Sequence, residues 1–84
     1  MSADVQYYVI VPSQRSRAAA GLARRTLDPA GPVDETLRRD LTWRPDSAIA
    51  EWEYGDLDAE LVRISEREAE SLTQAFRARW NRTG

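Results

Sequence analysis

Large β-favouring side chains occupy almost every position of residues 5–11, where Gln6 is the exception. Successive side chains of a strand point to opposite faces, so both faces of this segment would be apolar. This pattern predicts an interior strand that ends at Pro12, because proline cannot donate to a sheet. Residues 60–65 also alternate, with Leu61 and Val62 on opposite sides, and predict another strand of the same sheet.

The clearest helical pattern covers residues 65–81. Ser65 and Glu68 have the spacing of a capping box, in which each side chain bonds the other residue's backbone. Apolar residues then follow at helical spacing, at Ala69, Leu72, Phe76 and Trp80. The pattern predicts a C-terminal helix that packs on the sheet.

A second helix is predicted over residues 32–42. Pro32 suits the first turn, and apolar residues recur every four positions, at Val33, Leu37 and Leu41. Glu35 and Arg39 would pair at a spacing of four, and Pro45 would end the element, since the residue before a proline avoids helical geometry.

Two segments allow alternative readings. Residues 13–27 are either a helix capped by Ser13 or a loop followed by a strand over residues 22–27, with a turn at residues 28–31. We favour the strand, paired antiparallel with the first. Residues 46–54 suit a strand or a short helix, and we favour the helix.

The elements together predict an α+β fold. We expect a small antiparallel or mixed sheet of about three strands, covered by two to three helices. With 84 residues the chain can build one core only, so residues 1–84 are expected to form a single domain.

The chain contains no cysteine, histidine or lysine, since all 12 basic residues are arginines. Thiolate, imidazole and Schiff-base chemistry are therefore excluded, and zinc loses its preferred ligands. An acidic segment with Asp56, Asp58 and Glu60 resembles the start of a calcium loop, but Leu61 and Arg67 stand where the turn glycine and the closing acid are required. We expect no catalysis, no cofactor and no metal.

Partner binding is the function that the remaining residues favour. Trp43, Trp52 and Tyr54 are aromatics at expected element ends, and arginines flank the first of them, at Arg38, Arg39 and Arg44. We predict a non-enzymatic protein-interaction module, an adaptor or regulator, whose partner is another protein or a second copy in a homodimer.

The alternative is a nucleic-acid-associated regulator. Residues 13–44 carry seven arginines against four acidic residues, whereas residues 45–84 carry five against nine. The net charge of −2 makes nucleic acid the less favoured partner. The short apolar run of residues 5–11 follows Asp4 and has no basic stretch before it, so we expect no membrane segment and a cytoplasmic protein.

Several short segments occur in an order that resembles small actinobacterial proteins of unknown function. These segments are Tyr7-Tyr8, residues 21–25, residues 34–40 with Trp43, residues 55–57 and residues 60–66. The resemblance covers most of the chain. It implies a single intact domain and carries over no activity or site.

Overall fold

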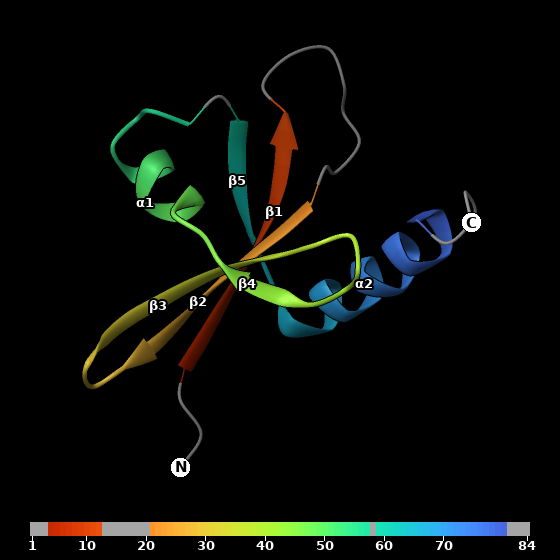
Figure 1. The fold of residues 1–84 in the computed structure, drawn as a ribbon, viewed down its shortest axis with the longest axis horizontal. Coiled ribbons are helices and arrows are strands. Elements are labelled where there is room, and N and C mark those ends of the chain that lie inside the picture. Colours follow the sequence, from red (N-terminus) through yellow and green to blue (C-terminus); the bar gives the residue numbers. More distant parts are fainter. Residues whose placement is uncertain (1–3, 13–20, 58, 81–84) are drawn as a thin grey trace.

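The computed structural model describes residues 4–12, 21–57 and 59–80. Its centre is a five-stranded sheet in the order β4-β3-β2-β1-β5, in which every pair of neighbours is antiparallel. Among the described residues two helices accompany the sheet, and Figure 1 shows them on different sides of its strands. The predicted α+β class is therefore correct, but the sheet has five strands where about three were expected.

Three strands lie where the sequence predicts them. β1 (Asp4–Pro12) is interior, because it pairs with β2 (Gly21–Asp28) on one side and with β5 (Ala59–Ile64) on the other. The strand preferred over residues 22–27 is confirmed. The alternative helix was to begin at Ser13, and residues 13–20 lie outside the described part of the chain.

The helix predicted over residues 32–42 is wrong. This segment forms most of β3 (Gly31–Leu37) and the turn that leads to the short edge strand β4 (Trp43–Pro45). The expected Glu35–Arg39 pair is replaced by cross-strand pairs: Arg24 Nε lies 2.9 Å from Glu35 Oε1, and Arg25 Nε lies 2.8 Å from Asp34 Oδ1. Opposite charges on facing strands thus stabilise β3 as a strand.

The turn predicted at residues 28–31 connects β2 to β3. Asp28 pairs with Gly31, so only Pro29 and Ala30 form the loop. Gly31 has a φ of 131°, a value that side chains disfavour, and Asp28 Oδ1 accepts the Ala30 N–H at 2.9 Å. The resulting hairpin extends away from both helices in Figure 1.

Adjacent residues of β2 divide the core into two clusters. Leu22 packs with Leu37 and Phe76, whereas Ala23 packs with Ile49 and Leu61. Because neighbouring side chains of a strand point to opposite faces, the two clusters lie on the two faces of the sheet.

Each face of the sheet is covered by one helix. α2 (Glu66–Trp80) contributes Phe76 to the first cluster, and α1 (Ala48–Glu53) contributes Ile49 to the second. The short helix favoured over residues 46–54 is thus confirmed, as is the packed C-terminal helix. Within the described residues, no helix is long and apolar enough to cross a membrane.

Local hydrogen bonds define where both helices begin. At α2, Ser65 Oγ accepts the Glu68 N–H at 3.1 Å while Glu68 Oε1 accepts the Ser65 N–H at 3.0 Å, which is the predicted capping box. The Ser65 backbone N–H, and to a smaller extent its hydroxyl, lower the pKa of the Glu68 carboxyl. At α1, Asp46 Oδ1 accepts the Ala48 N–H at 2.8 Å.

Candidate functional site

A groove of about 340 Å³ runs between α2 and the strands β1 and β4. Tyr7 of β1 and Trp43 of β4 line its sheet side. The helix side is lined by residues of α2, namely Glu66, Ala69, Glu70, Thr73, Gln74 and Arg77. Their spacing of three and four positions places them along one face of the helix.

The helix side of the groove is hollow because its buried position holds a small residue. Ala69, in the first turn of α2, is 3% exposed and presents only a methyl group to the groove. Thr73, one turn later, directs its hydroxyl to the Ala69 carbonyl oxygen at 2.7 Å. This bond keeps the hydroxyl against its own helix, so the groove wall at Thr73 presents a methyl group.

Trp43 is the central wall of the groove, and its ring is held from two directions. The Arg24 guanidinium carbon lies 4.2 Å from the ring centroid, a cation–π distance. The Tyr7 ring meets it edge-on, with centroids 6.3 Å apart and planes at 63°. Arg24 is itself fixed by its pair with Glu35. The half-buried Trp43 ring is therefore preorganised as a rigid surface.

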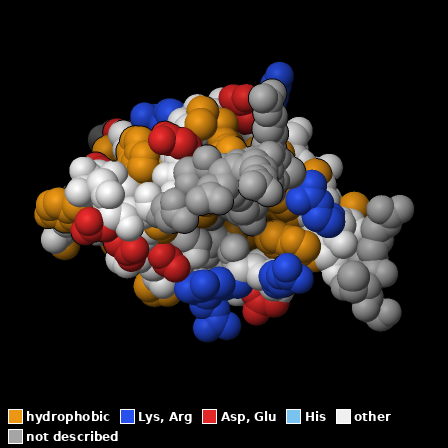
Figure 2. Space-filling view, turned by 90° about the horizontal axis from the view of Figure 1, so that it is seen from above, with side chains coloured by type: hydrophobic (Ala, Val, Ile, Leu, Met, Phe, Trp, Pro, Cys, Tyr) orange, Lys and Arg blue, Asp and Glu red, His pale blue; other side chains and the backbone are white. Residues whose placement is uncertain are grey.

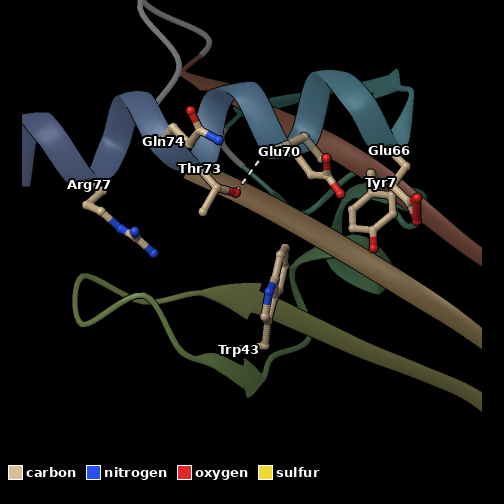
Figure 3. Close-up of a pocket in the computed structure, with 8 residues that line it drawn as sticks. Tyr7, Trp43, Glu66, Glu70, Thr73, Gln74 and Arg77 are labelled. Atoms are coloured by element: carbon tan, nitrogen blue, oxygen red, sulfur yellow. Dashed lines mark hydrogen bonds between the residues drawn. The ribbon is translucent and has the colours of Figure 1, made fainter.

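The two ends of the groove carry opposite charge. Figure 3 shows Glu66 and Glu70 beside Tyr7, with Arg77 at the other end and Trp43 between them in this view. Within the described part of the chain, none of these three charged side chains has an ion-pair partner. They are therefore available to a ligand. The aromatic residues beside them are of types that are enriched at protein interfaces.

The three aromatics predicted to bind a partner do not share one surface. Trp43 faces α2, whereas Trp52 packs in the opposite cluster, with its ring centroid 6.1 Å from that of Tyr8. Tyr54 follows the end of α1 and is 83% exposed. The structure thus places only Trp43 in the groove.

The three predicted arginines lie around β4 and its preceding turn, and all are exposed. Arg38 Nη2 lies 3.2 Å from Asp46 Oδ2, and Arg44 Nη2 lies 4.0 Å from Asp40 Oδ2. Hydrogen bonds from the Thr42 hydroxyl and backbone N–H, with a smaller contribution from Arg44, lower the pKa of Asp40. Of these arginines, none lines the groove.

The sequence reading missed Tyr7, Glu66, Glu70 and Arg77 as groove residues. Tyr7 lies in the predicted interior strand, and the α2 charges, acidic in the first turn and basic in the last, are those that the helix dipole favours in any helix. A signal was present in the spacing. Glu66, Glu70 and Arg77 share a helix face that adjoins the apolar face with Ala69, which has the smallest side chain of that apolar face.

The acidic segment before β5 was expected to bind no metal. Of its three residues, Asp56 and Glu60 are exposed and Glu60 already belongs to β5, whereas Asp58 lies outside the described residues. Across residues 4–12, 21–57 and 59–80, no three acidic side chains gather in a way that could hold a metal ion.

A scan against protein-family models found no match, and searches of curated proteins and of solved structures found none either.

Proposed function

We propose that the protein is a non-enzymatic interaction domain, an adaptor or regulator, that binds an extended segment of a partner protein in the α2 groove. The observation that carries the proposal is the combination of a held, half-buried Trp43 ring with three charges around one groove that have no ion-pair partner among the described residues. Rigid aromatic surfaces contribute most of the binding energy at protein interfaces, and they lose little entropy on binding.

The length of the groove suits a peptide. Glu66 and Arg77 are eleven positions apart on α2, which corresponds to roughly 16 Å along the helix axis. An extended chain advances about 3.3 Å per residue, so about five residues span that distance. Apolar side chains of such a segment would contact Trp43 and Tyr7, as in other grooves that bind peptides through aromatic residues.

Nucleic acid is less well supported as the partner. Arg24, Arg25 and Arg38 of the basic segment are each engaged by acidic side chains, which leaves little of their charge for phosphates. The groove presents two carboxylates, which would repel a phosphate backbone. In Figure 2, arginine and acidic side chains are interspersed among hydrophobic ones across the face in view.

A displayed library of random peptides, selected on the immobilised full chain, tests the proposal. We expect enriched peptides that bind in fluorescence anisotropy and lose affinity by about tenfold or more, roughly 1.4 kcal/mol, when Gln74→Trp fills the groove. Ser71→Trp adds the same ring to an exposed position outside the groove and should leave binding unchanged. Selection of no peptide, or equal loss in both variants, would refute the groove as the binding site.

A further inference from the structure

The groove has a polarity that constrains what it can bind. Its two carboxylates, Glu66 and Glu70, lie one helical turn apart at the end beside Tyr7, and Arg77 lies near the opposite end. A bound segment with a positive side chain at the Glu66–Glu70 end and a negative side chain at the Arg77 end would meet opposite charge at both ends. A segment of reversed polarity would meet like charge at both.

The middle of the groove selects a different chemistry. Between the charged ends, the walls are the Trp43 ring and the methyl of Ala69, together with the part of Thr73 that its hydroxyl bond leaves facing outward. Apart from the Trp43 indole N–H and the amide of Gln74, which also lines the groove, these surfaces offer no hydrogen bond to a polar side chain. Burying an apolar side chain here is favourable, whereas burying a charged one would cost desolvation energy.

We infer that the groove recognises a partner segment with a basic residue and an acidic residue about five positions apart, separated by apolar residues that pack on Trp43. This inference rests on the proposed peptide-binding function and adds the chemistry of the peptide. The charges lie on exposed side chains of α2, so they select the orientation of the segment more than they add affinity.

The experiment uses the peptides enriched on the wild-type chain, synthesised with labelled ends. Their consensus is expected to contain the basic, apolar and acidic positions at this spacing. Changing the basic residue to glutamate should weaken binding about fivefold or more, because an attractive contact becomes a repulsive one. The doubly substituted chain Glu66→Lys/Glu70→Lys should reverse this preference and bind the glutamate peptide better than the parent.

A matched control separates the local contact from net charge. The variant Asp56→Lys/Glu60→Lys has the same change in net charge, at exposed positions outside the groove, and should keep the wild-type preference. Circular dichroism verifies that α2 is intact in each variant. Because lysines near its N-terminus oppose the helix dipole, Glu66→Gln/Glu70→Gln serves as a milder variant, which should remove the preference without reversing it.

The outcomes distinguish the two proposals. Peptides that bind and are blocked by Gln74→Trp, but that show no charge pattern or no reversal, would overturn this inference and leave the proposed function standing. Failure to enrich any peptide would overturn both. Sedimentation of the wild type as a dimer that Gln74→Trp converts to monomer would identify a second copy as the occupant, and would also overturn the inference.

Discussion

Arg25 and Glu53, which are 28 positions apart in the chain, are joined by two hydrogen bonds of 3.0 Å from the two terminal guanidinium nitrogens. The same guanidinium binds Asp34 through Nε at 2.8 Å and Nη2 at 3.0 Å. The bonds to Asp34 and then to Glu53 raise the pKa of Arg25. One side chain of β2 thus connects β3 to the end of α1.

Arg25→Met should lower the free energy of unfolding by about 2–3 kcal/mol. Methionine keeps the apolar stem but leaves the Asp34 carboxylate, only 16% exposed, without its partner. Glu53→Gln should cost about 0–1 kcal/mol, because that side chain is 50% exposed. Urea denaturation measures both values. Equal costs would mean that the bond to α1, and not the pair within the sheet, is the important one.

Phe76→Ala should be among the most damaging substitutions, with a cost of about 3–5 kcal/mol. The Phe76 ring is 1% exposed and stacks on Trp80, with centroids 4.8 Å apart and planes at 6°. A loss of that size is a large part of the stability of a small domain. Denaturant unfolding measures it, and near-UV circular dichroism should show loss of the Trp80 signal. Ala75→Ser, at the exposed neighbouring position, should change stability by less than about 0.5 kcal/mol.

The capping box of α2 should make the start of the helix sensitive to acid. The pKa of Glu68 is lowered in the folded protein by its hydrogen bonds with Ser65, so the unfolded chain binds that proton at higher pH. The stabilisation is therefore complete above the unfolded value of about 4.3, and it is lost as the pH falls through the lower, folded pKa. An NMR titration of the Glu68 side-chain carbon measures this pKa.

Ser65→Ala is the companion variant for the capping box. It should raise the pKa of Glu68 part of the way toward its ordinary value, because the hydroxyl is removed while the larger contribution, from the Ser65 backbone N–H, remains. Loss of the bond from the Glu68 N–H to the hydroxyl should cost about 1 kcal/mol of stability. A Glu68 pKa that is the same in the variant and the wild type would show that the hydroxyl makes no contribution.

The sequence predicted the elements in which local pattern and tertiary environment agree. Residues 5–11 are apolar on both faces because α2 packs on one face of the sheet and α1 on the other, and the C-terminal helix carries its own cap and apolar stripe. These signals are local. They need no knowledge of which residues lie opposite.

The misassigned segment 32–42 had a helical spacing that was coincidental. Val33 is 47% exposed and Leu37 is 7% exposed, and Leu41 occupies a turn with a φ of 66°, so these three residues form no common helix face. The decisive signal was non-local. Arg24 and Glu35 are equally far from the Pro29-Ala30 turn on its two sides, and so are Arg25 and Asp34. In a hairpin closed by this turn, each arginine therefore faces an acidic residue on the opposite strand.

The groove could be predicted only in part for a similar reason. From its type and its charged neighbours, Trp43 was predicted to bind a partner. Its contact with Tyr7, and the position of both beneath α2, depend on β3 and β4 being strands. With residues 32–42 predicted as a helix, Trp43 could not be placed near Tyr7 of β1. The second side of the groove, opposite the helix face with Glu66, could therefore not be predicted.

Trp52 of α1 and Tyr54, which follows the end of α1, should respond differently to replacement by alanine. Trp52 packs against Tyr8, so Trp52→Ala should lower the unfolding free energy by about 2 kcal/mol and leave the sedimentation coefficient unchanged. Tyr54 is 83% exposed, so Tyr54→Ala should change stability by less than about 0.5 kcal/mol, and any homodimer built on this end of α1 should weaken. Urea denaturation and sedimentation velocity at tens of micromolar measure the two effects. A Trp52→Ala protein of unchanged stability that sediments more slowly than the wild type would place the Trp52 ring in an interface between copies instead of in the core.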